Sequence, residues 1–182
     1  MVNPRSPFSE KSRRRESIRK QLQAISPSER QWRSLRICKQ LYSLFFGKKV
    51  LALFAPTPTE PNLDLLWDLD LPASHLVSYP RCEGGTLLFR PVSALSELVR
   101  GRFGIREPVA GPALAQLDLI LVPGLAFAAE GSRLGRGAGF YDRFLSTIPA
   151  TTAKIGVCFE FQRVSEIPQE SHDVKMDAVV CG

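Results

Sequence analysis

The sequence lacks the long apolar run that a membrane-spanning helix requires, because none of its hydrophobic stretches approaches about 18 residues. Its first residues, MVNPRSPFSEKSRRRES, are polar and basic and contain no apolar segment of the kind found in a secretory signal. From these two absences we expect a cytoplasmic protein that has no membrane partner.

Histidine and cysteine are scarce, with two histidines and four cysteines among 182 residues. The cysteines lie far apart and form no C-x-x-C motif, which argues against a zinc ribbon or a redox pair. Cysteines scattered in this way in a reducing compartment are mostly small buried residues. The same scarcity argues against covalent catalysis.

Recognisable nucleic-acid motifs are missing too, since the chain has no RNP motif, zinc finger or aromatic-interleaved basic platform. Its net charge of +6 and pI of about 9.4 nevertheless favour anionic partners such as phosphates, acidic ligands or nucleic acid. Six of the positive charges lie in KSRRRESIRK, residues 11–20. This run is either a solvated helix face or part of an anion site, and we do not expect a nucleic-acid partner.

Apolar residues make up 44% of the chain, which is enough for a packed core, and the length suits one domain. We expect residues 1–9 to be a flexible N-terminus and residues 10–182 to form a single domain. Helices are predicted at residues 10–25, 26–46, 63–69, 93–99 and 139–147, the second of them opened by the capping box S-P-S-E.

Strands are predicted at residues 48–56, 75–80, 86–92, 117–124, 154–160 and 175–182, and a loop at residues 101–112. The alternation of strands and helices predicts an α/β fold, a single three-layer α/β/α domain with a mostly parallel central sheet. The strand at residues 117–124 is nearly continuous in apolar residues, so we expect it to be central and covered on both faces.

The stretch RLGRGAGFYD, residues 133–142, brings together three glycines, two arginines and a carboxylate. Glycines let a backbone form a concave nest of N–H groups, and Arg133 and Arg136 present fork-shaped donors that suit phosphate oxygens. Asp142 supplies the oxygen ligands that Mg²⁺ prefers. The pattern is neither a Walker A loop nor a G-x-G-x-x-G motif, and the alternative is a plain entry into a helix.

Ligands of open α/β sheets bind at the carboxyl ends of the strands, where three predicted loops lie. The first contains Glu60, the second contains residues 133–142, and the third contains S-H-D at residues 171–173. The second follows a strand that ends V-P-G and is longer than a tight connection needs, which favours a functional loop.

The segment VPGLAFAAEGSRLGRGAGFYDRFL resembles the signature of the 5-formyltetrahydrofolate cyclo-ligase (methenyltetrahydrofolate synthetase) family. Shorter segments resemble other parts of that family in the same order, namely K-S-R-R-R at residues 11–15, T-E-P at 59–61, F-G-I-R-E-P at 103–108 and H-D-V-K-M-D at 172–177. The resemblance covers nearly the whole chain from Lys11.

The resemblance implies an enzyme that converts 5-formyltetrahydrofolate and ATP into 5,10-methenyltetrahydrofolate, ADP and phosphate, using Mg²⁺. In that family the formyl oxygen is thought to take the γ-phosphoryl group, after which N10 of the folate attacks the activated carbon. The ATP-binding residues implied are Lys11, Arg15, Arg133, Leu134, Gly135, Arg136, Gly137, Ala138, Gly139, Phe140 and Tyr141. The implied substrate-binding residues are Ala55, Glu60, Arg136 and Phe140, the catalytic residues Arg136 and Tyr141, and the metal ligands Asp142 and Asp173.

Some roles stay open at this point. Asp177 lies near Asp173 and competes with it as the second metal ligand, and His172 has either an orienting or a structural role. Phe140 and Tyr141 either stack on a ligand or pack their helix. Phe140 also replaces the tyrosine that the family often has, and the residues after Glu60 depart from the family pattern. The rival functions are an enzyme of the same fold that acts on another acid substrate, and a folate- or nucleic-acid-binding protein without turnover.

Overall fold

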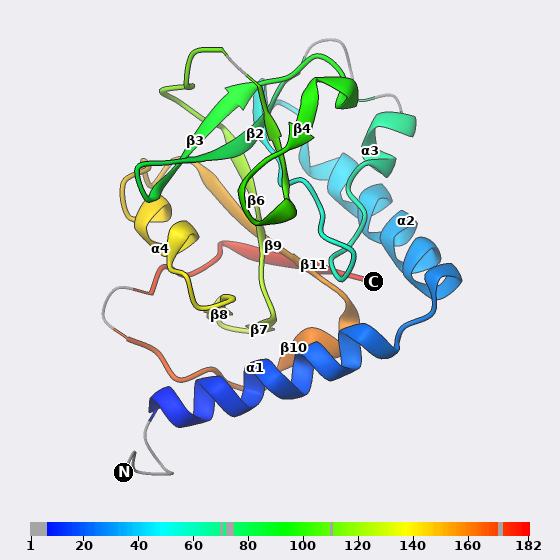
Figure 1. Cartoon of the computed structure of the whole chain (residues 1–182), viewed down its shortest axis with the longest axis vertical. Helices are drawn as coiled ribbons and strands as arrows, with labels where there is room; N and C mark the ends of the chain where they lie inside the picture. The colour runs from blue at the N-terminus through cyan, green and yellow to red at the C-terminus, as the bar shows by residue number, and fades with distance from the viewer. Residues whose placement is uncertain (1–6, 70, 72–74, 110, 171–172) are drawn as a thin grey trace.

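The computed structural model describes residues 7–69, 71, 75–109, 111–170 and 173–182 (Figure 1). Its α-helices are α1 (Pro7–Ala24), α2 (Pro27–Leu44), α3 (Leu65–Asp68) and α4 (Phe140–Leu145). Its longer strands are β2 (Leu76–Glu83), β3 (Thr86–Pro91), β6 (Leu119–Pro123), β9 (Ala153–Cys158) and β11 (Ala178–Cys181). Its shorter strands are β1 (Val50–Ala52), β4 (Leu98–Arg100), β5 (Arg106–Pro108), β7 (Ala126–Ala128), β8 (Arg133–Leu134) and β10 (Arg163–Val164).

A six-stranded sheet in the order β11-β9-β6-β1-β2-β3 forms the centre of the fold. All neighbouring pairs in it are parallel except β2 and β3, which form an antiparallel hairpin. The predicted α/β fold with a mostly parallel sheet is therefore confirmed. The strand β6 lies between β9 and β1, as its continuous apolar sequence predicts.

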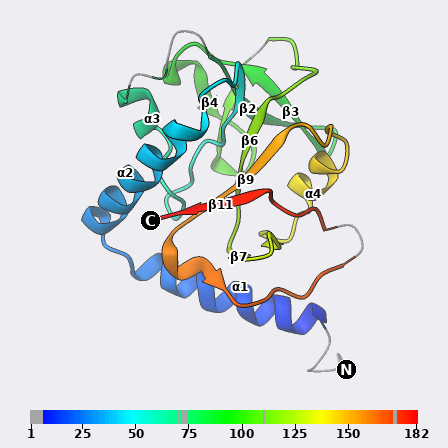
Figure 2. The ribbon, with the colours of Figure 1, turned by 180° about the vertical axis from the view of Figure 1, so that it is seen from behind.

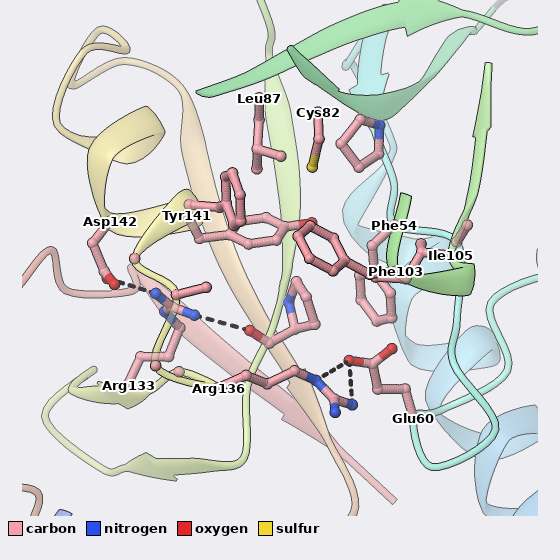
Figure 3. Close-up of a pocket in the computed structure, with 18 of the residues that line it drawn as sticks. Phe54, Glu60, Cys82, Leu87, Phe103, Ile105, Arg133, Arg136, Tyr141 and Asp142 are labelled. Carbon is pink, nitrogen blue, oxygen red and sulfur yellow. Dashed lines mark hydrogen bonds and ion pairs between the residues drawn. The ribbon is translucent and has the colours of Figure 1, made fainter. Parts of the chain in front are cut away.

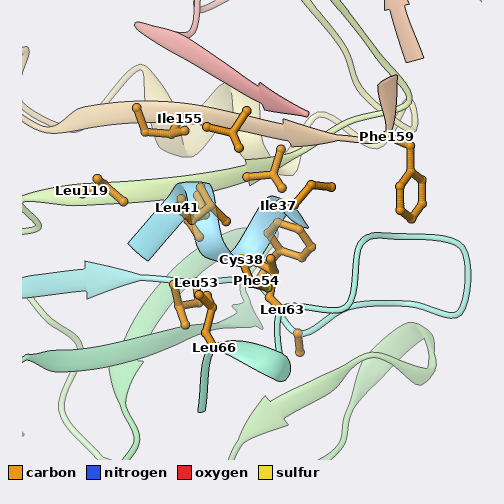
Figure 4. Packing of buried hydrophobic residues seen from close by; sticks show 14 of the residues in the cluster. Ile37, Cys38, Leu41, Leu53, Phe54, Leu63, Leu66, Leu119, Ile155 and Phe159 are labelled. Atoms are coloured by element: carbon orange, nitrogen blue, oxygen red, sulfur yellow. The ribbon is translucent and has the colours of Figure 1, made fainter. Parts of the chain in front are cut away.

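Both faces of the sheet are covered, which gives the three predicted layers. Successive side chains of a strand point to opposite faces, and Leu119 and Leu121 of β6 pack in one core cluster with Ile37 of α2. Ile120 of β6 packs in a second cluster with Leu145 of α4. Figure 4 shows the first cluster, in which α2 lies against the sheet.

The first two helices begin close to where the sequence predicts them. The hydroxyl oxygen of Ser26 accepts a hydrogen bond from the N–H of Glu29 at 3.2 Å, and Pro27 occupies the first turn of α2. Helix α1 begins at Pro7, three residues before the predicted start, and buries Ile18 and Leu22. Both views show α1 running past the short strands β7 and β10 rather than along a face of the main sheet (Figures 1 and 2).

Three regional predictions are wrong. The predicted helix at residues 93–99 is only a 3₁₀ turn (Leu95–Glu97) that leads into β4, and the predicted loop at residues 101–112 contains β5, which pairs with β4 as an antiparallel hairpin. The stretch after β6, predicted as an open loop, contains β7 and β8, which form a small sheet with β10. Strands of two or three residues are too short to show a period, and β10, the parallel partner of β7, lies far along the chain.

Cys38 and Cys158 are fully buried as predicted, whereas Cys82 and Cys181 are half-buried. Within the described ranges, no helix combines the length and the apolar character that a membrane span requires.

Candidate active site

A cavity of about 250 Å³ lies where β1 and β6 end at their carboxyl edge (Figure 3). The end of β1 contributes Phe54 and Ala55, and β6 contributes Pro123. Residues of β2, β3, the β4–β5 hairpin and the glycine–arginine segment 133–142 complete the wall. These are Pro80, Cys82, Leu87, Phe103, Ile105, Glu107, Arg133, Gly135, Arg136, Gly137, Ala138, Gly139, Phe140, Tyr141 and Asp142, with Glu60 from the loop after β1.

The glycine–arginine segment bends around this cavity because two of its glycines adopt positive φ angles. Gly137 has φ 107° and Gly139 has φ 68°, which are conformations that side-chain-bearing residues rarely adopt. Gly139 lies directly before α4, whose Phe140 and Tyr141 also line the cavity. The segment therefore presents both backbone and aromatic surface to a ligand.

Glu60 and Arg136 form an ion pair at the cavity wall (Figure 3). Arg136 donates from Nε and Nη2 to Oε1 of Glu60 at 3.1 and 2.9 Å, while Oε2 accepts the N–H of Thr57 at 2.8 Å. The Nη2 group also donates to the hydroxyl of Thr57 at 3.0 Å. These bonds join the loop after β1 to the glycine–arginine segment and fix both charges at the cavity.

Arg133 and Asp142 form a second pair, 2.5 Å apart between Nη2 and Oδ1. The Arg133 side chain is only 5% exposed, and Nη1 donates to the carbonyl oxygen of Pro123 at 3.2 Å. Its guanidinium carbon lies 5.7 Å from the centre of the Tyr141 ring. Arg133 therefore holds Asp142 and the Tyr141 ring in place around the end of β6.

The aromatic residues at the start of α4 lie in different surroundings. Burial raises the pKa of Tyr141, and the charge of Glu60 adds to this rise, so Tyr141 is a neutral phenol at physiological pH. The Phe140 ring lies 6.0 Å from the Phe103 ring in an edge-on arrangement, and the guanidinium of Arg143 lies 5.1 Å from the Phe140 ring centre.

Two basic residues of helix α1, Lys11 and Arg15, bind other parts of the same chain. Lys11 is 6% exposed and contacts Asp173 at 3.0 Å and Glu170 at 3.1 Å. Burial lowers the pKa of Lys11, but the hydrogen bonds to Asp173 and Glu170 outweigh it, so the pKa is raised above its ordinary value. Arg15 donates to the carbonyl oxygen of Gly135 at 3.0 Å. Part of the predicted basic run is therefore engaged next to the glycine–arginine segment.

The two predicted metal ligands are each paired with a cation. Asp142 pairs with Arg133 through Oδ1, which leaves its second carboxylate oxygen beside the cavity, and Asp173 forms an ion pair with Lys11. Among the residues described, no three His, Cys, Asp or Glu side chains cluster as a complete metal site. Mg²⁺ is usually held by one or two carboxylates together with substrate phosphates, so these two acids would fit such a site as part of its ligand set.

Other predicted residues are placed as follows. Ala55, Ala138 and Gly135 line the cavity, whereas the Leu134 side chain is 1% exposed in the core, so only its backbone is available to a ligand. Asp177 accepts the N–H of Lys154 at the start of β9, at the opposite edge of the sheet. His172 lies outside the described residues.

Sequence reasoning missed the cavity wall that β2, β3 and the β4–β5 hairpin supply. Phe103, Ile105 and Glu107 lie in the segment that resembles the family's G-I-x-E-P motif, and that resemblance was the available signal. Cys82 and Leu87 gave no signal, since only the folded hairpin brings them to the cavity. The pairing of Thr57 with Arg136 likewise joins segments 79 residues apart.

Comparison with known proteins shows the family to which the chain belongs. The family model described as the 5-formyltetrahydrofolate cyclo-ligase family matches residues 7–182. A 5-formyltetrahydrofolate cyclo-ligase of Mycolicibacterium smegmatis is 32% identical over 98% of this chain and 95% of its own, and the Escherichia coli K12 enzyme of that name is 31% identical over 90% and 95%. The solved structure of the Aquifex aeolicus 5,10-methenyltetrahydrofolate synthetase superposes with a TM-score of 0.84 at 34% identity, covering 94% of this chain and 89% of that one.

The extent of these matches and the placement of the glycine–arginine segment at the cavity lead to one assignment. The chain belongs to the 5-formyltetrahydrofolate cyclo-ligase family, as its sequence motifs predict, and is an enzyme of that family.

Proposed function

We propose that this protein acts in the cytoplasm as a 5-formyltetrahydrofolate cyclo-ligase, which converts 5-formyltetrahydrofolate and ATP into 5,10-methenyltetrahydrofolate, ADP and phosphate. The observation that carries the proposal is the cavity in which the Glu60–Arg136 pair meets the glycine–arginine segment. Its volume of about 250 Å³ lies below the roughly 300–1,000 Å³ of sites that enclose whole drug-sized ligands. It suits a bicyclic ring, with the nucleotide and the folate tail extending outside.

The proposed reaction has two steps. The formyl oxygen attacks the γ-phosphorus of ATP, the bond from that phosphorus to the β-phosphate oxygen breaks, and ADP leaves. N10 then attacks the formyl carbon, the carbon–oxygen bond breaks, and phosphate departs with the former formyl oxygen while N10 loses its proton. Phosphoryl transfer of this kind depends chiefly on positioning and charge neutralisation, so no protein nucleophile is needed.

Arg136 is the residue best placed to serve both substrates. Its side chain is 43% exposed and reaches from the glycine–arginine segment to Glu60, so it retains donors for a phosphoryl oxygen. The buried Glu60 carboxylate beside it favours the positive charge that develops on the formyl carbon and nitrogen. The neutral phenol of Tyr141 supplies a donor and an apolar ring without adding charge.

The nucleotide is proposed to lie between the glycine–arginine segment and α1, with Lys11, Arg15 and Arg133 near its phosphates. Asp142 and Asp173 would hold Mg²⁺, which supplies charge neutralisation on the phosphates when bound. Asp173 is favoured over Asp177 because Asp173 contacts Lys11, whereas Asp177 binds the backbone at the opposite edge of the sheet. The contacts of Lys11 and Arg15 with the protein also make the basic run a poor nucleic-acid surface.

The test is the absorbance of 5,10-methenyltetrahydrofolate after purified protein is mixed with 5-formyltetrahydrofolate and Mg-ATP. We expect a signal that requires all three components and that disappears when ATP or Mg²⁺ is omitted. Folded protein that binds 5-formyltetrahydrofolate but gives no ATP-dependent signal would instead support the rival reading, a folate-binding protein without turnover. RNA or DNA binding that falls steeply with salt and ignores ATP would favour the nucleic-acid rival.

A further inference from the structure

Glu107 is a buried acidic residue of the cavity that the proposed chemistry does not use. It lies on β5, is 7% exposed and lines the cavity. The other carboxylates there are paired, Glu60 with Arg136 and Asp142 with Arg133. Within the part of the chain that the structure describes, no hydrogen bond or ion pair reaches the Glu107 carboxylate.

The hairpin is built to place this carboxylate. A Cβ atom at Gly101 would lie 2.6 Å from Cδ and Oε2 of Glu107, so the side chain rests against the bare backbone of Gly101. Ile105 lies just before β5, two residues from Glu107, and also lines the cavity. A carboxylate in such an apolar setting is costly unless it gains hydrogen-bond donors. The missing donors therefore point to a ligand.

We propose that Glu107 is a substrate-binding residue that accepts the two adjacent N–H donors, N3–H and the 2-amino group, of the folate's 2-amino-4-oxopyrimidine ring. An ionised carboxylate offers two acceptor oxygens and no donor, which matches two neighbouring N–H groups as a bidentate pair. The adenine ring of ATP presents an amino group next to a ring acceptor, which satisfies only one of these oxygens. The inference rests on the proposed function, because it assigns the orientation of that substrate.

The proposal predicts a binding defect that is specific for the folate. In titrations with 5-formyltetrahydrofolate without ATP, we expect Glu107→Gln to raise Kd about tenfold to hundredfold, as for a lost hydrogen bond to a charged group. The KM for ATP should stay within about twofold. Thermal stability should be unchanged or higher, since the variant removes an unpaired buried charge. Gly101→Ala, which pushes the carboxylate aside without removing it, should weaken binding in the same direction.

A 2-desamino analogue of 5-formyltetrahydrofolate identifies the contact. Wild-type protein should bind the analogue about tenfold more weakly than the parent compound, whereas Glu107→Gln should distinguish the two by less than about twofold. The control is Glu97→Gln, an exposed glutamate before the same hairpin, which should match wild type throughout.

The outcomes separate this inference from the proposed function. Wild-type protein that neither binds nor converts 5-formyltetrahydrofolate overturns the proposed function and this assignment with it. Active wild-type protein with an unimpaired Glu107→Gln variant overturns the assignment alone. A Glu107→Gln variant that binds 5-formyltetrahydrofolate more weakly, yet still distinguishes the analogue from the parent compound as strongly as wild type does, also overturns the assignment alone.

Discussion

Replacing Asp142 by asparagine separates the structural role of this residue from its proposed role in the reaction. The Asp142 side chain is 22% exposed and pairs at 2.5 Å with Arg133, whose side chain is 5% exposed. Breaking a buried pair typically destabilises a protein by about 3–5 kcal/mol. The asparagine oxygen still accepts a hydrogen bond and the site is partly exposed, so we expect a loss of about 1–2 kcal/mol.

The expected effect of Asp142→Asn on turnover is much larger than its effect on stability. Removing a charge that acts on the transferring phosphoryl group lowers kcat by about 100- to 1,000-fold, equivalent to about 3–4 kcal/mol in the transition state. The free energy of unfolding is measured by urea titration, and kcat at a temperature where each variant is folded.

Asp177→Asn is the matched control, because Asp177 accepts a backbone N–H at the opposite edge of the sheet and should lose stability without losing turnover. An Asp142→Asn variant that is destabilised but retains wild-type kcat would refute the role assigned to Asp142 and leave only its pairing with Arg133.

Three further variants test other parts of the account. Glu60→Gln should lower kcat/KM for 5-formyltetrahydrofolate about tenfold to hundredfold in steady-state assays and lower stability by about 1–2 kcal/mol, because the amide keeps one acceptor oxygen where Oε1 accepts from Arg136 and Oε2 accepts the N–H of Thr57. Two backbone N–H groups at the start of β1 lower the pKa of Asp118, so its stabilisation is present above pH 3.8 and lost as the pH falls further. Urea titrations should therefore find Asp118→Asn less stable by about 1–3 kcal/mol at neutral pH, with a difference that fades below pH 3.8; a constant difference would contradict this. Gly131→Ala should lower the melting temperature more than Gly84→Ala, because both have positive φ but only the Cβ at Gly131 would meet a backbone oxygen, that of Met176 at 2.3 Å.

The parts of the fold that the sequence predicts are those in which local pattern and burial agree. The apolar strand β6 is buried on both faces, and the S-P-S-E box starts α2 through a contact three residues away. The β4–β5 hairpin and the strands β7 and β8 were missed, because strands of two or three residues show no clear period, and β7 also pairs with β10 from a distant part of the chain. Tertiary pairing outweighs local preference in such short elements.

The candidate site also has residues that the sequence indicates and contacts that only the fold shows. Glycines and arginines spaced along one segment indicate an anion loop, and the family resemblance brings in Glu60 and Lys11. Their partners could not be read from the sequence, since Glu60 meets Arg136 across 76 positions and Lys11 meets Asp173 across 162. The resemblance marked the segment of Glu107, but only the fold shows that its carboxylate is buried at the cavity and has no partner among the described residues.

The most direct test of the central claim follows the formyl oxygen. 5-Formyltetrahydrofolate labelled with ¹⁸O in the formyl group is incubated with the protein and Mg-ATP, and the phosphate released is analysed by mass spectrometry. Attack of that oxygen on the γ-phosphorus predicts one ¹⁸O in each phosphate, formed in step with 5,10-methenyltetrahydrofolate. Unlabelled phosphate alongside the same folate product would contradict the account.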